Sequence, residues 1–443
     1  MNEELERLVE LDKKHVWHPF TQAQTAPDPV PIERGEGVVL HTADGRQIID
    51  YISSWWVNLY GHAHPRVSAA IAEQASQLEQ VIFAGFTHRP AIRLAEKLAE
   101  LLPGDLSRVF YSDNGSTAVE VGLKMAYQYW ANKGQSQRKR FLTFDGAYHG
   151  DTVGAMSAGV SSRMFDAWKE LFFTVDVLDY PNTWENDARC EEKEARALKL
   201  LDDFLDRHAQ ETCALIMEPL VQGASGIRMV RPEFVKAVVE RLREHGILVI
   251  FDEVMTGFGR TGSNFACEKI GVVPDIICLS KGLTAGFLPL SVTVAREEIY
   301  REFLGESFDR AFCHGHSFTA NPLGCAAALA SMELLQSEEV RQSFKRIEKA
   351  HDRGLDYLRD LKQTTAHRIC GTIGAFDAVV DDGGYTSSLG NDLKRWFWDR
   401  NMLLRPLGNV VYQLPPYVIT DEQIDLGWKA AAEAMIKLNP PKA

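Results

Sequence analysis

The chain has 443 residues, which is too long for one small core and predicts a large domain with a smaller one beside it. With 45% hydrophobic and 25% charged residues, it has the composition of an ordinary globular enzyme. The net charge of −13 argues against a nucleic-acid partner, and no apolar run is long enough to span a membrane.

The N-terminus and the cysteines both favour a cytoplasmic protein. Residues 1–7 are polar and largely acidic with no apolar stretch, so we predict no signal peptide. The seven cysteines are scattered and never spaced as Cys-x-x-Cys. This pattern predicts free thiols in a reducing compartment, with neither disulfides nor a metal site.

Short β runs alternate with helical patterns along most of the chain. Asp44-Gly45 predicts a hairpin turn between strands at 38–42 and 46–51. Continuous apolar strands between helices indicate an α/β sheet covered on both faces. These strands are expected at 108–111, 140–144, 214–217, 246–251, 275–279 and 290–294. Beyond about residue 330, long amphipathic helices with a few strands, one at 410–414, predict a separate C-terminal domain.

Two polar residues end buried strands and carry most of the functional interpretation. Asp252 closes the run 247–251, and Lys281 follows the run 275–279. Lysines are commonly solvated, but one at the end of a buried run loses proton affinity and becomes a nucleophilic amine. The pair suits pyridoxal 5'-phosphate, since the amine can form a Schiff base and the carboxylate can pair with the pyridinium nitrogen.

A small-residue turn follows the strand at 108–111 and opens a helix that runs through Lys124 and Tyr127. The backbone N–H groups of such a helix start can bind a phosphate. Gly115 allows close approach, and Ser116 and Thr117 add hydroxyl donors. A capped helix with no ligand is the alternative for this motif taken alone.

Three other positions have less specific signals. Tyr148 follows a strand and could stack on a planar cofactor, although a core aromatic is the simpler interpretation. Of the adjacent Trp55 and Trp56, one should lie in the core and the other should face a cavity. Arg405 stands inside an apolar stretch and needs a partner, either a substrate carboxylate or a structural ion pair.

Two glycine-containing motifs are ambiguous. The G-x-G-x-x-G at 257–262 does not lie directly between a strand and a helix, so we reject a dinucleotide site and predict a tight loop beside the cofactor. The run 314–322 contains two histidines but no further metal ligands at suitable spacing. Its glycine and hydroxyl residues favour phosphate binding instead.

Taken together, these motifs resemble the class III (ω-type) aminotransferases of the fold-type I pyridoxal-phosphate superfamily. The matching segments span most of the chain in the family's order, at 114–116, 148–150, 252–260, 280–282 and 314–317. The resemblance implies an α/β fold with a large mixed-sheet cofactor domain and a smaller α+β domain from both termini. The corresponding boundaries are 1–60 and 329–443 for the small domain and 61–328 for the large one.

The resemblance also implies roles for individual residues. Lys281 would hold the cofactor and move the proton, Asp252 would bind the ring nitrogen, and Tyr148 and Val254 would pack on the ring. Ser317 would bind the phosphate from a partner subunit, which implies a homodimer. Further implied contacts are Gly115, Ser116 and His316 with the cofactor, and Trp55, Tyr148, Lys281, Gly315 and Arg405 with substrate.

Within the class, the chain is similar to the members that aminate 8-amino-7-oxononanoate in biotin biosynthesis. The closer signs lie at 17–19, 53–56, 124–130, 148–152, 221–224 and 405–408. Many members that use S-adenosylmethionine carry Tyr after His-Pro and Pro-Thr after His-Gly, whereas this chain has Phe20 and His316-Ser317. S-adenosylmethionine is the expected amino donor, and lysine is the alternative.

Three other functions compete with this interpretation. The first is another ω-aminotransferase, acting on ornithine, 4-aminobutyrate or a polyamine, which the Trp pair and the 148–151 motif oppose. The second is an aminomutase, which would need no separate acceptor. The third is a non-catalytic binding protein, which the presence of Lys281 and Asp252 opposes.

Overall fold

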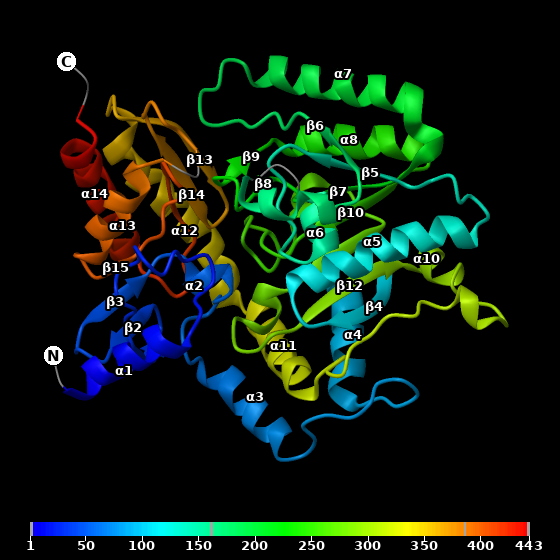
Figure 1. Ribbon diagram of the computed structural model, residues 1–443, viewed down its shortest axis with the longest axis horizontal. Coiled ribbons are helices and arrows are strands. Elements are labelled where there is room, and N and C mark those ends of the chain that lie inside the picture. The colour runs from blue at the N-terminus through cyan, green and yellow to red at the C-terminus, as the bar shows by residue number, and fades with distance from the viewer. Residues whose placement is uncertain (1–2, 160–162, 385–386, 441–443) are drawn as a thin grey trace.

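A seven-stranded sheet lies at the centre of the computed structural model, which describes residues 3–159, 163–384 and 387–440 (Figure 1). The strand order is β4-β12-β11-β10-β7-β5-β6, and β12 runs antiparallel to both neighbours while all other pairs are parallel. The strands are β4 (Leu106–Ser112), β5 (Arg140–Phe144), β6 (Val175–Leu178), β7 (Thr212–Met217), β10 (Leu248–Asp252), β11 (Ile276–Leu279) and β12 (Ser291–Arg296).

Helices cover both faces of this sheet, as the apolar strands predict. Ile250 and Ile276 pack into one core with α5, whereas Val249 and Ile277 point to the opposite core. Edge strand β6 was not predicted, because only Leu178 of its four residues is buried. The helices of this region are α4 (Arg89–Leu101), α5 (Gly115–Asn132), α6 (Val153–Ala158), α7 (Cys190–His208), α8 (Pro232–Glu244), α9 (Ala266–Ile270), α10 (Glu297–Arg301) and α11 (Pro322–Leu335), and α3 (Pro65–Ala75) packs on α11.

The two ends of the chain share a smaller sheet, which joins β1 (Ile32–Glu36), β2 (Val39–Thr42), β3 (Gln47–Asp50) and β15 (Met402–Leu403). The antiparallel pairing of β2 with β3 confirms the hairpin turn predicted at Asp44-Gly45. Strand β15 pairs in parallel with β3, which brings Leu403 opposite Asp50. Figure 1 shows the blue N-terminal strands beside the orange and red C-terminal elements.

A third sheet forms the rest of the C-terminal region, with strands β13 (Thr364–Cys370), β14 (Ile373–Ala378) and β16 (Val410–Gln413). It packs with the amphipathic helices α12 (Glu338–Arg359), α13 (Leu389–Trp398) and α14 (Asp421–Leu438), whose Trp428 is fully buried. The arrangement agrees with the expected helices and strands. The domain boundaries at 60 and 328 stay a prediction.

The G-x-G-x-x-G loop at 257–262 joins these regions to the large sheet. The fully buried Arg260 donates to the carbonyl oxygens of Pro415 at 2.7 Å and Asn58 at 3.0 Å. None of the loop's residues lines the large cavity described below. That the loop lies beside the cofactor stays a prediction; the Arg260 guanidinium ties together three distant segments of the chain.

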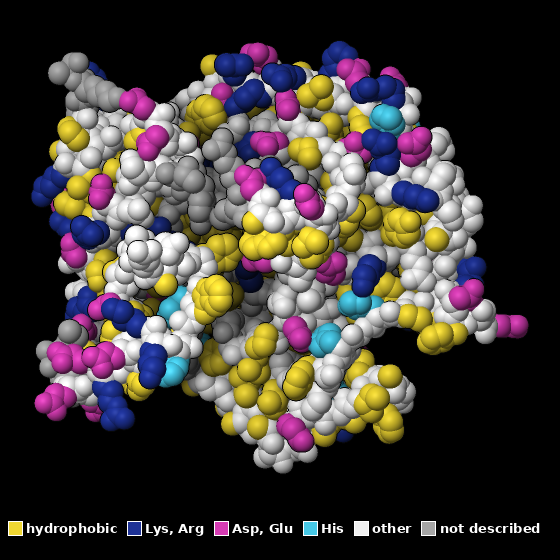
Figure 2. Space-filling model, viewed as in Figure 1, with side chains coloured by type: hydrophobic (Ala, Val, Ile, Leu, Met, Phe, Trp, Pro, Cys, Tyr) yellow, Lys and Arg dark blue, Asp and Glu magenta, His cyan; other side chains and the backbone are white. Residues whose placement is uncertain are grey.

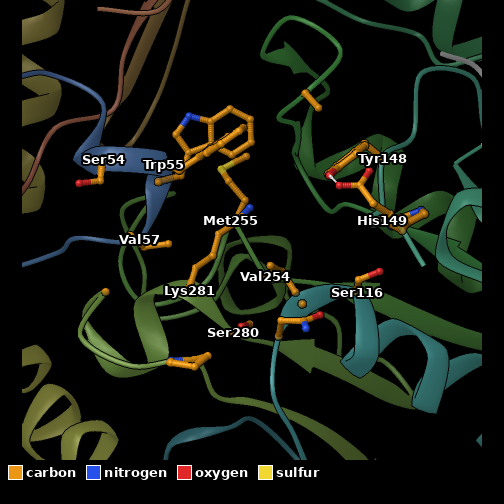
Figure 3. A pocket seen from close by; sticks show the side chains of 18 of the residues that line it. Ser54, Trp55, Val57, Ser116, Tyr148, His149, Val254, Met255, Ser280 and Lys281 are labelled. Carbon is orange, nitrogen blue, oxygen red and sulfur yellow. Dashed lines mark hydrogen bonds between the residues drawn. The ribbon is translucent and has the colours of Figure 1, made fainter. Parts of the chain in front are cut away.

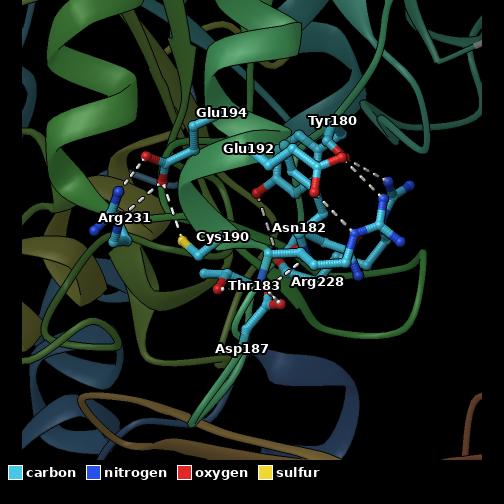
Figure 4. A network of polar contacts seen from close by, with 11 residues as sticks. Tyr180, Asn182, Thr183, Asp187, Cys190, Glu192, Glu194, Arg228 and Arg231 are labelled. Carbon is cyan, nitrogen blue, oxygen red and sulfur yellow. Dashed lines mark hydrogen bonds and ion pairs between the residues drawn. The ribbon is translucent and has the colours of Figure 1, made fainter.

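Polar contacts anchor the segments behind β5 (Figure 4). Arg231 pairs with Glu194 of α7, its Nε donating to Oε1 at 2.9 Å. Arg228 donates to the carbonyl oxygen of Asp145 at 3.1 Å and also pairs with its carboxylate. The contacts of Arg228 with Asp145 hold the turn that leads from β5 to Tyr148, and the Arg231–Glu194 pair joins α7 to the start of α8.

The sequence also predicts no membrane span, no metal site and no disulfide. None of the helices described is long and apolar enough to cross a membrane. The described side chains form no cluster of three or more potential metal ligands, and all seven cysteines are free thiols.

Candidate active site

A cavity of about 1000 Å³ opens at the carboxyl edge of the large sheet (Figure 3). Figure 3 shows Trp55 and Tyr148 on different sides of it, with Lys281 reaching in from below. Eight of the predicted site residues line it, namely Trp55, Gly115, Ser116, Tyr148, Asp252, Val254, Lys281 and Arg405. The sheet brings six of them together because its parallel strands end at a common edge, whereas Trp55 and Arg405 come from segments near the two ends of the chain.

Lys281 follows β11 and points its amine into the cavity. Burial lowers the pKa of this amine below its ordinary value, although the carboxylates of Asp252 and Glu218 oppose the shift. Its Nζ lies 4.8 Å from the centroid of the Trp56 ring. A buried lysine with a lowered pKa has a larger neutral, nucleophilic fraction near neutral pH.

Asp252 ends β10 and is held by two donors. The Nδ1 of His149 lies 2.7 Å from its Oδ2, and the N–H of Val254 donates to its Oδ1 at 3.1 Å. The carboxylate and the imidazole are both buried. His149 belongs to the predicted 148–150 motif, but no local pattern indicates its role, because its partner lies 103 residues away.

Glu218 is a second residue that sequence reasoning missed. It follows β7, lines the cavity and accepts from the backbone N–H groups of Tyr148 at 3.1 Å and Gly223 at 2.9 Å. Burial raises the pKa of this carboxyl to about 7. Only its place after the apolar run 214–217, which parallels that of Asp252, could have signalled it.

The N-terminus of α5 faces the same cavity. Asn114 caps the helix by accepting from the N–H of Thr117 at 3.0 Å, and the N–H groups of Gly115 and Ser116 have no partner within the helix. A Cβ at Gly115 would lie 2.6 Å from Cγ1 of Val254, so a larger residue would displace that side chain. The Ser116 hydroxyl lies 2.7 Å from that of Thr152.

Tyr148 forms part of one wall. Its ring lies nearly parallel to that of Phe165, at an interplanar angle of 21° and a centroid distance of 6.3 Å. Its hydroxyl donates to Asp151 at 3.0 Å. Burial raises the pKa of this phenol, which stays protonated at neutral pH.

Segments from both ends of the chain form the opposite wall. Trp56 is 6% exposed and Trp55 is 43% exposed, so one is buried and one open, although both line the cavity. The guanidinium of Arg405 lies 4.8 Å from the Trp55 ring centroid, and the Phe20 ring lies 5.6 Å from it. No carboxylate in the described ranges forms an ion pair with Arg405.

Gly315, His316 and Ser317 do not line this cavity. Gly315 and Ser317 are exposed, and Nδ1 of His316 lies 3.4 Å from a carboxylate oxygen of Asp113. Within a single chain, this loop therefore contacts the cavity wall only from behind, at Asp113, and its three predicted residues do not line the cavity.

The residues present fit pyridoxal phosphate. The helix start with Gly115 and Ser116 offers N–H and hydroxyl donors to a phosphate. The His149-supported Asp252 offers a carboxylate to a ring nitrogen, and the amine of Lys281 lies in the same cavity. Between these groups, Val254 and Tyr148 provide apolar and aromatic surface.

The buried carboxyl of Glu218 should make stability depend on pH. With a native pKa of about 7 and an unfolded value near 4.5, the folded state holds this proton more tightly. Its stabilising contribution is full below the unfolded pKa and is lost as pH rises through about 7. From about pH 5 to 8, wild type should lose roughly 2–3 kcal/mol more unfolding free energy than Glu218→Gln.

Urea unfolding of the cofactor-free protein at several pH values measures this difference. Glu240→Gln is the matched control, because Glu240 is exposed on α8 and forms no ion pair in the described ranges, so its curve should run parallel to that of wild type. If the Glu218→Gln curve runs parallel to wild type, the carboxyl does not retain its proton.

Comparisons with known proteins cover nearly the whole chain. A family model described as Aminotransferase class-III matches residues 20–435. An adenosylmethionine-8-amino-7-oxononanoate aminotransferase from Synechococcus elongatus is 54% identical over 422 residues, which is 95% of this chain and 98% of the relative.

Two solved structures agree with these sequence matches. The enzyme of the same name from Methanocaldococcus jannaschii is 34% identical with a TM-score of 0.89, covering 98% of this chain and 99% of that one. A PMP-bound aminotransferase from Vibrio fluvialis is 27% identical with a TM-score of 0.90, covering 98% of each chain. The predicted α/β, fold-type I transferase is confirmed, and the chain belongs to the class III aminotransferase family.

Proposed function

We propose that this aminotransferase uses pyridoxal 5'-phosphate to transfer an amino group to 8-amino-7-oxononanoate, forming 7,8-diaminononanoate in biotin biosynthesis. The 54% identity to a relative named for this reaction, over 95% of the chain, is the observation that carries the proposal. S-adenosylmethionine is the proposed amino donor, since the relative's name includes it.

The buried polar groups of the cavity are suited to this chemistry. When bound, the cofactor supplies an aldehyde that takes up the amino group and a ring that withdraws electrons. Lys281 provides the amine that holds it, and its Nζ accepts and returns the proton at the carbon bearing the amino group. Asp252, hydrogen-bonded to His149 and to the backbone N–H of Val254, would pair with the ring nitrogen.

The wall formed by Trp55 and Arg405 suits the keto acid. Its long aliphatic chain can lie along the indole, while the guanidinium, which has no carboxylate partner in the described ranges, can bind the acid group. The cavity of about 1000 Å³ has room for the substrate beside the cofactor. Gly315, which does not line the cavity of its own chain, is proposed to contact substrate in the partner's site.

Lysine is a second candidate donor, and Phe20 favours it. This residue lines the cavity with its ring 5.6 Å from that of Trp55, so the wall lacks the hydroxyl that a tyrosine would offer to S-adenosylmethionine. An aliphatic donor such as lysine would not need this hydrogen bond.

The active unit is proposed to be a homodimer in which His316 and Ser317 reach the partner's phosphate site. Large apolar side chains near this loop support the proposal, with Phe318 58%, Ile82 64% and Phe86 63% exposed. Figure 2 shows hydrophobic side chains gathered over the lower part of the molecule, where Figure 1 places the chain between α3 and α4 and before α11. A cytoplasmic location stays a prediction, supported by seven free thiols.

The donor is tested by mixing the cofactor-loaded protein separately with S-adenosylmethionine and with lysine. We expect S-adenosylmethionine to bleach the visible absorption band of the lysine-bound cofactor, and added 8-amino-7-oxononanoate to restore it. Bleaching by lysine alone would assign lysine as donor. If neither amine bleaches the band and the keto acid never restores it, the proposed reaction is wrong; Lys281→Ala, which cannot form the band, is the control.

Replacing Arg405 should weaken binding of the keto acid. Losing a charge-assisted pair with its carboxylate should raise KM for 8-amino-7-oxononanoate roughly 10- to 100-fold in Arg405→Gln. Initial rates at varied keto acid measure this change. Arg400→Gln is the matched control, since this guanidinium stacks on Trp396 at 3.3 Å and does not line the cavity. Equal KM values in both variants would remove Arg405 from the substrate site.

Mixing two inactive variants tests the shared site. In a dimer of Lys281→Ala with Ser317→Asp, one site has an intact lysine and receives an intact serine from the partner. Random reassociation of equal amounts should then restore about a quarter of wild-type activity, because half the dimers are mixed and each has one complete site. No restoration, despite mixed dimers by mass spectrometry, would mean that Ser317 acts within its own chain.

A further inference from the structure

The segment that carries the two cavity tryptophans has a strained backbone. Ser53, Ser54 and Trp56 have φ values of 53°, 59° and 66°, although none is glycine. The ψ of Ser54 is −94°, which places it near the rare γ-turn conformation. Such conformations persist only where the surrounding structure holds them, and they concentrate at functional sites.

One buried carboxylate holds this turn. Asp50 is fully buried at the end of β3, where its Oδ1 accepts from the N–H of Ile52 at 3.0 Å. Its Oδ2 accepts from the N–H of Ser54 at 2.6 Å and lies 3.0 Å from Nε2 of His62. Three donors on one desolvated carboxylate form a strong, directional clamp.

The clamp is itself fixed to both ends of the chain. The N–H of Asp50 donates to the carbonyl oxygen of Val38 at 2.8 Å, and Asp50 pairs with Leu403 of β15. The N–H of His62 donates to the carbonyl oxygen of Gly37 at 2.7 Å, which pins the imidazole beside the β1–β2 hairpin. The turn is therefore held at a set position relative to Arg405, two residues after Leu403.

The path of the turn decides where both tryptophans lie. Trp56 packs against the amine of Lys281 at 4.8 Å and donates through Nε1 to the hydroxyl of Tyr412 at 3.0 Å. Trp55 packs against the guanidinium of Arg405 at 4.8 Å. Relaxing the backbone at Ser54 would move both rings, so the clamp acts on the substrate wall without contacting substrate.

We propose that Asp50, supported by His62, is a positioning residue for the substrate site. Its carboxylate holds the strained turn so that Trp55 stays against Arg405 and Trp56 against Lys281. The identity of the substrate rests on the proposed function, whereas the clamp itself rests on the hydrogen bonds given above. Neither Asp50 nor His62 lines the large cavity.

Asp50→Asn tests this role, because an amide of the same shape loses the charge and one acceptor. We expect KM for 8-amino-7-oxononanoate to rise by roughly 10-fold, with kcat changed by less than about 3-fold and the cofactor absorption band unaltered. Asp44→Asn is the matched control. Asp44 holds the exposed hairpin turn of the same sheet through an ion pair with Arg46 at 2.9 Å. Its substitution should leave KM unchanged.

A second substitution separates positioning from general stability. Glycine adopts positive φ without strain. Adding Ser54→Gly to Asp50→Asn should therefore reverse much of the rise in KM. His62→Gln should give a smaller rise in KM than Asp50→Asn. Its control is His41→Gln, since His41 contacts Arg34 and not the clamp.

Hydrogen exchange of the cofactor-free protein gives a readout independent of the reaction. Peptides covering 52–57 should exchange faster in Asp50→Asn than in wild type or Asp44→Asn. Unchanged exchange together with unchanged KM overturns the proposal, and so does a fall in kcat or cofactor binding with KM unchanged. If wild type does not aminate 8-amino-7-oxononanoate, the proposed function fails. The role of Asp50 is then still tested by hydrogen exchange and by KM for whichever keto acid the enzyme accepts.

Discussion

The burial of four ionisable groups at one edge of the sheet is the constraint on which the site depends. His149, Glu218, Asp252 and Lys281 follow β5, β7, β10 and β11, which lie side by side and parallel. Their side chains meet because parallel strands end at the same edge. Buried charges need partners, and here the imidazole and backbone N–H groups form hydrogen bonds to the carboxylates. Burial lowers the pKa of the lysine, which favours its neutral form.

This cluster accounts for only half of the cavity. Trp55 and Trp56 come from the N-terminal segment and Arg405 from the chain after β15, and the pairing of β3 with β15 joins them. Arg260 then ties these segments to the large sheet through Asn58 and Pro415. The groups suited to cofactor chemistry and those suited to substrate selection are thus built from separate regions, so one half can vary while the other keeps its geometry.

The sequence predicts those features that have a local signature. Apolar runs ending in Asp252 and before Lys281 predict both strand ends, and small residues before α5 predict its exposed N–H groups. The roles of His149 and Glu218 depend on strand order, which no local pattern gives. The strained turn at Ser54 is equally hidden, because a positive φ normally implies glycine and here a distant carboxylate replaces that preference.

Fold similarity alone does not identify the substrate, since aminotransferases with different names superpose on this chain with TM-scores of 0.89 and 0.90. Discrimination must come from groups outside the buried charge cluster, which serves any amine. The Trp55 ring contacts Phe20 edge-to-face at a centroid distance of 5.6 Å and lies 4.8 Å from the Arg405 guanidinium, so the position of the turn affects both neighbours along the wall. A backbone strained to fix this ring lowers local stability but gives the cavity a wall of defined shape.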